Sequence, residues 1–279
     1  MRVTDLTNFI IARHQIWTNR FKHKREKPWT DDPILQQYRF CNVYRELDTV
    51  TQWVAEKYRR YSGSNSFWFA MVMCRLINWP PTLEELWRPS MEWDAEEFIR
   101  VMSRRMKAGE KTWSSAYMIR SSGRAKHLYL AHEVLTPMWE ARERLRPQYN
   151  DDSLAAFHAR LCEMNGMGSF LAAQVAADVK YGSNCPLMKA PDWWTWAASG
   201  PGSRRGLNRV CGRDFKSPWK EDDWLSLLQA LRDKVNPVIK KRGMQELHAQ
   251  DLQNCLCEFD KYERVRLGEG RPRQNYKGV

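Results

Sequence analysis

Apolar side chains recur at three- and four-residue spacing along most of the chain, which is typical of amphipathic helices. Between residues 34 and 58 this spacing predicts one long helix. Further helices are predicted over residues 126–146, with a break or a restart at Pro137, and over residues 153–164, 170–179, 221–235 and 249–262. Alternation of period two is nowhere sustained, so we expect an all-α fold.

Local signals refine this picture. Thr82 with Glu85, and Asp94 with Glu97, have the spacing of capping boxes, and Gly109 is expected to end the helix that Asp94 begins. The sequence contains neither an internal repeat nor a low-complexity linker. We therefore expect residues 1–279 to form a single domain with two helical lobes, followed over about residues 262–279 by a basic C-terminal tail.

Charge and aromatic content favour a polyanionic partner. The chain has 45 Lys and Arg against 33 Asp and Glu, a formal charge of +12, and 14 tryptophans. Much of the excess charge lies in residues 20–27, 199–213 and 261–277. Basic stretches interleaved with aromatic residues suit nucleic acid, although a basic protein with a tryptophan-rich core would show the same composition.

The remaining composition excludes several classes of protein. No apolar run approaches the roughly 18 residues of a membrane span, and the N-terminal segment has no cleavage site of the secretory kind, so a cytoplasmic protein without membrane contact is expected. The 7 cysteines are scattered without a CxxC pair, and the 6 histidines lack ligand spacing. We expect no protein-bound transition metal, whereas Mg²⁺ stays open, because carboxylates are present but no spacing marks a site for it.

The first candidate site is a helical hairpin at residues 154–179. Its turn, Asn165-Gly166-Met167-Gly168, precedes Ser169 and an alanine-rich helix. Glycines in such a turn let backbone N–H groups approach a phosphate, and the segment resembles the helix-hairpin-helix element of DNA glycosylases. An ordinary helix stop followed by a turn would have the same sequence.

Two aspartates near this hairpin are candidate catalytic bases. Asp192 follows Gly168 by 24 residues, which is where the glycosylases place an active-site aspartate. Trp193, Trp194 and Trp196 follow it. Asp192 could equally be an N-cap, and Asp178 could equally be a buried, hydrogen-bonded carboxylate. Ser169 and Phe170 occupy the place of the lysine of lyase-type glycosylases, which disfavours a Schiff base there.

A second candidate site is the string GPGSRRGLNR, residues 200–209, which we interpret as a loop. Ser203, Arg204, Arg205 and Arg209 could donate to a phosphate or pyrophosphate, since guanidinium groups match phosphate oxygens in pairs. A solvated basic turn is the alternative. The string is not a Walker A loop, and the nearest approach to one, at residues 109–112, has a glutamate before its lysine.

Two further strings carry weaker signals. Asn42, Arg45, Asp48 and Gln52 would form one polar stripe on the helix predicted over residues 34–58, either for hydrogen bonding to a ligand or as a structural salt-bridge stripe. Residues 256–265 alternate in charge, and from spacing alone they would be a solvated helix.

Together, the strings YRFCNVYRELD, NGMGSFLAAQVAADV, GPGSRRGLNRV and LCEFDKYERVRLGEGRPRQNY resemble a family of bacteriophage proteins. These are the α-glutamyl/putrescinyl thymine pyrophosphorylases, also called amino acid:DNA transferases, which hypermodify thymine in DNA. A related helical domain accompanies the 5-hydroxymethyluracil DNA kinases. The resemblance covers about residues 34–276 and implies a helix-hairpin-helix glycosylase-like fold.

The resemblance implies an enzyme that acts on double-stranded DNA in the infected host cell. A kinase makes the 5-pyrophosphoryloxymethyl base, and the transferase flips it out and replaces pyrophosphate with an amino acid or a polyamine, without a cofactor. Because the chain lacks a P-loop, it matches the transferases and not the kinases. A base-excising glycosylase and a non-enzymatic DNA-binding module are the alternatives.

Site roles follow from this implied reaction. Pyrophosphate would be held by Ser203, Arg204, Arg205, Arg209 and Lys261, and the catalytic base would be Asp192, with Asp178 second. DNA would contact Gly166, Gly168, Ser169, Arg264 and Arg266, while the base or the amine would be recognised by Asn42, Arg45, Asp48, Trp193 and Asn208.

Overall fold

The fold is helical throughout the part of the chain that can be described. The computed structural model describes residues 1–86, 92–114, 123–148, 152–272 and 275–276, so five residues of the predicted tail, 273–274 and 277–279, lie outside the described residues. Within the described ranges the regular elements are helices, and the β-contact is an isolated bridge between Tyr38 and Asn275. The all-α prediction is confirmed.

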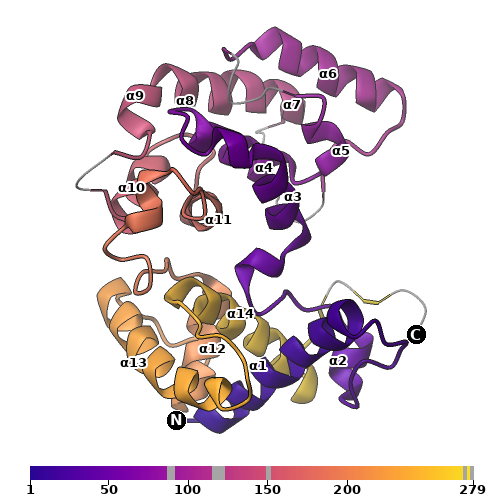
Figure 1. The fold of residues 1–279 in the computed structure, drawn as a ribbon, viewed down its shortest axis with the longest axis vertical. Coiled ribbons are helices and arrows are strands. Elements are labelled where there is room, and N and C mark those ends of the chain that lie inside the picture. Colours follow the sequence, from indigo (N-terminus) through magenta and orange to yellow (C-terminus); the bar gives the residue numbers. More distant parts are fainter. Residues whose placement is uncertain (87–91, 115–122, 149–151, 273–274, 277–279) are drawn as a thin grey trace. The chain divides into compact units, whose positions relative to one another are not determined.

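The chain divides into two compact units (Figure 1). Residues 1–48 and 194–279 form one, called here the terminal unit, and residues 49–193 form the other, the middle unit. None of the described helices is both long and apolar enough to cross a lipid bilayer.

The terminal unit is built on three long helices and the shorter ones around them. Its elements are α1 (Val3–Trp17), the π-helix η1 (Thr18–Lys22), α2 (Pro33–Gln37), η2 (Arg45–Leu47), α12 (Pro201–Cys211), α13 (Glu221–Lys240) and α14 (Ala249–Arg266). Trp224 of α13 and Leu256 of α14 are fully buried in one apolar cluster with Leu6 and Ile10 of α1. Residues 275–276 also contact this unit, where the Tyr276 N–H donates to the Gln37 carbonyl.

The middle unit surrounds an apolar helix. Its elements are α3 (Thr49–Tyr58), η3 (Arg59–Tyr61), α4 (Phe67–Ile77), α5 (Pro80–Leu83), α6 (Ala95–Lys107), α7 (Lys126–Tyr129), η4 (Leu130–Leu135), α8 (Thr136–Glu140), α9 (Arg142–Leu145), α10 (Leu154–Cys162), α11 (Ser169–Val179) and η5 (Pro186–Lys189). Every residue of α4 is buried, and α4 packs against α11. Figure 1 shows α10 and α11 as the two arms of the predicted hairpin.

Several predicted boundaries are confirmed. The Ser153 hydroxyl caps α10, and the Asp94 carboxylate caps α6 by accepting from the Glu96 and Glu97 N–H groups. Gly109 follows α6 with a φ of +69°, a conformation that favours glycine. The Thr82–Glu85 capping box is wrong, because Thr82 lies inside α5, which begins at Pro80.

The helix predicted over residues 34–58 is wrong in its middle. Residues 38–44 are not helical, because side chains from other helices take their backbone hydrogen bonds. Arg13 donates to the Phe40 carbonyl at 2.8 Å, and Glu258 accepts from the Cys41 N–H at 2.9 Å. The predicted stripe of Asn42, Arg45, Asp48 and Gln52 therefore does not form one helix face.

The string interpreted as a phosphate loop is also different in the structure. Residues 201–211 are the helix α12, with Gly200 at its N-cap and Pro201 in its first turn. Its glycines serve packing: a Cβ on Gly206 would lie 2.1 Å from the Leu256 carbonyl oxygen of α14, and one on Gly202 would lie 2.4 Å from the Cys257 sulfur. Glycines four residues apart let α12 and α14 approach closely.

We predict that Gly206→Ala destabilises the terminal unit. Alanine in a helix would gain about 1 kcal/mol over glycine, but overpacking against rigid backbone costs about 3 kcal/mol or more. Urea unfolding followed by circular dichroism should show a net loss of about 2 kcal/mol or more. The control is Gly200→Ala, whose Cβ would have its nearest neighbour at 3.9 Å and should cost about 1 kcal/mol or less. Equal effects of the two variants would contradict the packing role of Gly206.

Candidate functional site

A cluster of charged side chains lies where α12 meets α14. It consists of Arg205, Arg209, Glu258, Asp260, Lys261, Arg264 and Glu269, and is called here the α12–α14 charge cluster. The Asp260 carboxylate, fully buried, accepts from Arg205 Nε at 2.8 Å and from Arg209 Nε at 2.9 Å. Arg264 Nε lies 3.5 Å from the same carboxylate. One buried acid therefore orients two guanidinium groups by hydrogen bonds and attracts a third by its charge.

These guanidinium groups differ in exposure. The side chains of Arg205 and Arg264 are 33% and 32% exposed, whereas that of Arg209 is 7% exposed and also pairs with Glu269. Burial lowers the pKa of Arg209, but the hydrogen bonds that it donates to Glu269 and Asp260 outweigh this effect and leave the pKa above its ordinary value. Arg205 and Arg264 can thus meet a ligand from solvent, while Arg209 holds them in place.

Lys261 forms an ion pair with a second acid on α14, Glu258. Its Nζ lies 2.6 Å from Glu258 Oε2, which also accepts from the Cys41 N–H. Burial acts to lower the pKa of Lys261, but the charge of Glu258 raises it above its ordinary value. The same charge raises the pKa of the Cys41 thiol to about 12, so Cys41 is a thiol and no nucleophile at neutral pH.

Three other predicted ligands on α12 are used within the fold. The buried Ser203 hydroxyl accepts from the Gly200 N–H and donates to the Gly200 carbonyl, both at 3.0 Å. Arg204 donates to Glu221 at 2.7 Å, and the buried Asn208 amide donates to two carbonyls, of Phe215 and Ser217. The structure brings Arg205, Arg209, Lys261 and Arg264 together and gives Ser203, Arg204 and Asn208 structural partners.

The residues predicted to recognise the base or the amine also have partners in the terminal unit. Asn42 accepts from Arg13 at 2.8 Å and donates to the Leu47 carbonyl at 2.6 Å. The Arg45 N–H donates to Asp251, and Asp48 ends the short helix η2. Asn42 thus fixes the turn that precedes η2.

The catalytic-base candidates lie in the middle unit and differ in environment. Asp192 is partly exposed, and its carboxylate accepts from the Leu154 and Ala155 N–H groups at 2.8 and 3.0 Å. It therefore caps α10, a helix remote in sequence. Asp178 is 4% exposed and pairs through both oxygens with Arg75, a residue that the sequence analysis missed.

The hairpin of the middle unit has the turn expected of it. Gly166 has a φ of +76°, and a Cβ there would lie 2.7 Å from a Val134 methyl. Gly168 is the N-cap of α11, which begins without a side-chain cap, and His158 lies 3.0 Å from the Ser169 carbonyl. A helix start of this kind offers N–H groups to an anion.

The tryptophans that follow Asp192 differ in their exposure. The Trp193 ring meets Tyr181 edge-on at 5.8 Å, and its Nε1 donates to the Lys180 carbonyl. In the terminal unit Trp196 is 8% exposed, whereas Trp194 is 50% exposed. Of Trp194 and Trp196, Trp194 is therefore the more accessible to a ligand.

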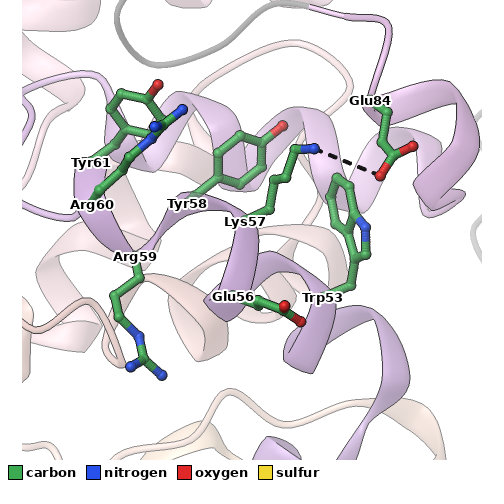
Figure 2. A pocket seen from close by; sticks show the side chains of 8 residues that line it. All are labelled: Trp53, Glu56, Lys57, Tyr58, Arg59, Arg60, Tyr61 and Glu84. Carbon is green, nitrogen blue, oxygen red and sulfur yellow. Dashed lines mark ion pairs between the residues drawn. The ribbon is translucent and has the colours of Figure 1, made fainter.

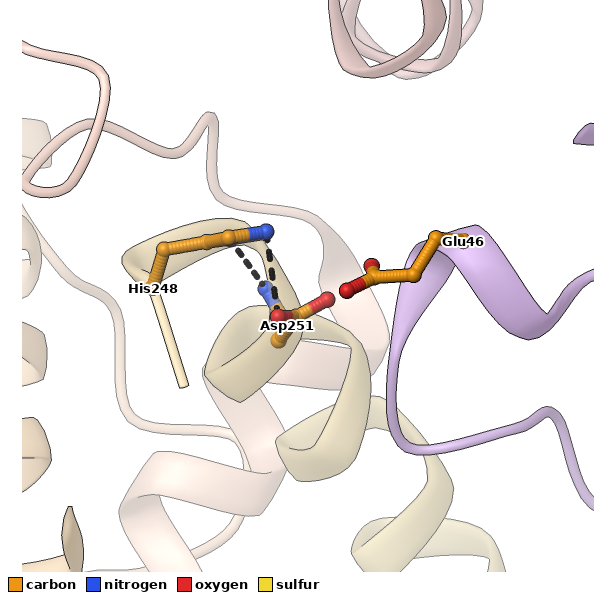
Figure 3. A group of neighbouring side chains, drawn as sticks. All are labelled: Glu46, His248 and Asp251. Carbon is orange, nitrogen blue, oxygen red and sulfur yellow. Dashed lines mark hydrogen bonds and ion pairs between the residues drawn. The ribbon is translucent and has the colours of Figure 1, made fainter. Parts of the chain in front are cut away.

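One group of side chains in the terminal unit has ligand types that suit a divalent cation (Figure 3). One ligand atom each from Glu46, His248 and Asp251 lies within 4.8 Å of the others. His248 Nδ1 accepts from the Asp251 N–H, and Nε2 lies 3.0 Å from the Asp251 carboxylate. A cation would therefore have to replace the Nε2 proton of the imidazole.

We predict that Asp260→Asn destabilises the terminal unit by about 3–5 kcal/mol, because it removes the buried carboxylate shared by Arg205 and Arg209 and leaves the buried Arg209 with Glu269 alone. Denaturant unfolding measures the change. The matched control is Asp233→Asn, which removes a carboxylate that is 67% exposed and should cost no more than about 0.5 kcal/mol. A loss below 1 kcal/mol for Asp260→Asn would contradict its central role.

Lowering the pH should reduce the unfolding free energy of the terminal unit, because Glu263 becomes protonated. Burial raises the pKa of this carboxyl, but hydrogen bonds from Arg266 and Arg2 outweigh it and hold the pKa below its ordinary value. Its stabilising contribution is then complete above the unfolded pKa of about 4.3 and is lost as the pH falls through the lower folded value. Unfolding free energies between pH 7 and pH 3 should fall less steeply for Glu263→Gln than for wild type. The control Glu26→Gln, at an exposed position, should show the same pH dependence of stability as wild type. If the curves of unfolding free energy against pH are parallel for all three proteins, Glu263 is not the cause of the loss of stability in acid.

Comparisons with known proteins agree with this helical architecture and place the chain in a family. Residues 2–271 match the family described as 5-hmdU DNA kinase, helical domain. The 5-hmdU DNA kinase of Bacillus phage SP10 is 23% identical over 280 residues, which cover 91% of this chain and 43% of that protein. The chain thus spans less than half the length of this curated relative.

No solved structure matches the chain. The resemblance drawn from the four strings is confirmed at the level of phage enzymes that act on hydroxymethyluracil-type bases in DNA. Because the match extends over nearly all of its residues, the chain belongs to the family of the 5-hmdU DNA kinase helical domain.

Proposed function

We propose that this helical domain transfers an amine to DNA, replacing the pyrophosphate of 5-pyrophosphoryloxymethyl-deoxyuridine with an amino acid or a polyamine. The observation that carries the proposal is the α12–α14 charge cluster, in a chain whose family acts on 5-hydroxymethyluracil DNA. It presents guanidinium groups, oriented in advance, to a leaving group that gains negative charge as its bond breaks.

The chemistry sets three requirements. The base must leave the stack, at a cost of about a few kcal/mol. Charge on the departing pyrophosphate must be stabilised, a role for Arg205 and Arg264, with Arg209 holding the geometry and Lys261 adding charge. The amine must be neutral to attack the methylene carbon, so a carboxylate has to accept its proton.

For the base we propose Asp192 over Asp178. Both oxygens of Asp178 accept from Arg75 in a buried ion pair, so a proton on Asp178 would cost the buried Arg75 its counter-charge. Asp192 is partly exposed and accepts hydrogen bonds from two backbone N–H groups, so its outer lone pairs can still accept a proton. The start of α11 at Gly168, and Arg266 in the terminal unit, are proposed to contact DNA phosphates.

Phosphorylation of the base is assigned to a kinase and not to this chain. The printed sequence has no GxxxxGK[ST] string, and residues 109–112 read Gly-Glu-Lys-Thr. A 5-hydroxymethyluracil DNA kinase would make the substrate, and the helical domain would consume it. Both steps would take place on phage DNA in the infected cell.

The direct test uses duplex DNA carrying 5-pyrophosphoryloxymethyluracil, incubated with the protein and a mixture of amino acids and polyamines. Digestion to nucleosides and mass spectrometry should reveal a new nucleoside with the mass of thymidine plus one amine less two hydrogens, one from the thymine methyl group and one from the amine. Free modified base with abasic sites would instead show a glycosylase. Salt-sensitive binding without any product would show a DNA-binding module.

We predict that Arg205→Ala lowers turnover on this substrate by about 10²-fold or more, because it removes a donor to the leaving group. The matched control is Arg204→Ala, the neighbouring arginine, whose guanidinium is held by Glu221. It loses the same charge from the same helix and should keep turnover within about threefold of wild type. Equal losses for both variants would contradict the assignment of pyrophosphate to the α12–α14 charge cluster.

A further inference from the structure

A hollow of about 700 Å³ opens on the middle unit (Figure 2). Its walls come from α3, from the short helix η3 and from the residue after α5. The lining residues, called here the Tyr-Arg pocket, are Trp53, Glu56, Lys57, Tyr58, Arg59, Arg60, Tyr61 and Glu84. Its volume lies in the range of pockets that hold small organic ligands, about 300–1,000 Å³.

Aromatic rings form a fixed part of the pocket. Tyr58 is 3% exposed, and its ring meets that of Trp53 edge-on, with centroids 5.8 Å apart. Tyr61 is partly exposed and carries the Arg60 guanidinium over its face at 4.7 Å. The buried tyrosine holds Trp53 in place, so the pocket offers two accessible rings, Trp53 and Tyr61, against which a flat group can stack.

The charges of the pocket leave two arginines available. Lys57 Nζ lies 3.6 Å from the Glu84 carboxylate, so this pair is largely neutral. Arg59 and Arg60 are both exposed, and neither forms an ion pair with any residue that the structure describes. Figure 2 shows the two guanidinium groups extending in different directions from η3, one on each side of the chain. They can therefore contact two separate anionic groups.

We propose that the Tyr-Arg pocket binds an unstacked nucleotide of a DNA strand. Its base would stack on Trp53, and Arg59 and Arg60 would hold the phosphates on either side of it. An amine substrate suits the pocket less well, because the cations of its lining, Lys57, Arg59 and Arg60, outnumber its acids, Glu56 and Glu84. The proposal shares with the proposed function only the choice of DNA as the substrate.

The test measures binding of an unmodified, fluorescently labelled single-stranded oligonucleotide to the whole chain at several salt concentrations. The double variant Arg59→Ala/Arg60→Ala should weaken binding by about tenfold or more and reduce the salt slope by about 1.4, since each lost phosphate contact contributes about 0.7. The control, Arg100→Ala/Lys107→Ala, removes two exposed cations from α6 of the same unit and should leave affinity and slope near wild type.

A second readout follows the ring itself. Trp53→Phe keeps an aromatic face and should bind the oligonucleotide within about threefold of wild type, but it should lose part of the tryptophan quenching that accompanies binding. Unchanged quenching in Trp53→Phe would show that no base stacks on Trp53. If the double variant and its control bind equally, the pocket does not hold the strand.

Free nucleotides provide the last arm. Thymidine monophosphate at millimolar concentration should compete only weakly, because it offers one phosphate instead of two. If thymidine monophosphate binds tightly, and the double variant loses affinity for it but keeps its affinity for the oligonucleotide, the pocket is a free-nucleotide site. The strand assignment is then wrong. These assays use neither modified base nor amine. A negative result in them would therefore not count against the proposed transfer reaction, and a failure to detect transfer would not count against nucleotide binding in the Tyr-Arg pocket.

Discussion

Helices α12 and α14 approach each other until backbone touches backbone, and the chemistry of the terminal unit depends on that approach. Gly206 leaves no room for even a methyl group before the Leu256 carbonyl, which would lie 2.1 Å from it. At this separation Arg205 and Arg209 reach Asp260, three to four residues further along α14 than the contact itself. With larger residues at 202 and 206, the helices would separate and the arginines would lose their common acid.

The buried acid gives these arginines a fixed direction. Removing Asp260 from water carries a large desolvation cost, which hydrogen bonds from Arg205 and Arg209 offset. A guanidinium held on one edge by a carboxylate still has N–H groups on its other edge. Arg205 is therefore oriented before any ligand arrives, whereas Arg59 and Arg60 in the middle unit are exposed and must be ordered by whatever they bind.

How far the sequence predicts this architecture depends on whether local pattern or remote partners decide each segment. The hairpin of α10 and α11 follows from Ser153, from its apolar spacing and from Gly166, all of them local. The α12 segment misled the sequence analysis because Gly-Pro-Gly is typical of loops, while its glycines actually serve contact with α14. Spacing alone also could not distinguish Arg204 from Arg205, since their different partners, Glu221 and Asp260, lie on two different helices.

The pairing of Asp178 with Arg75 was open to prediction. Each is a lone charge in a strongly apolar helix, Arg75 in FWFAMVMCRLI and Asp178 in SFLAAQVAADV. A buried charge without an opposite partner is too costly to persist, so two such helices in one domain imply that their charges meet. Once they do, the carboxylate serves the core, because accepting a proton would leave Arg75 buried and unpaired. For the reaction proposed above, the same physical rule favours as the base a partly exposed carboxylate such as Asp192, whose hydrogen bonds come from neutral backbone groups.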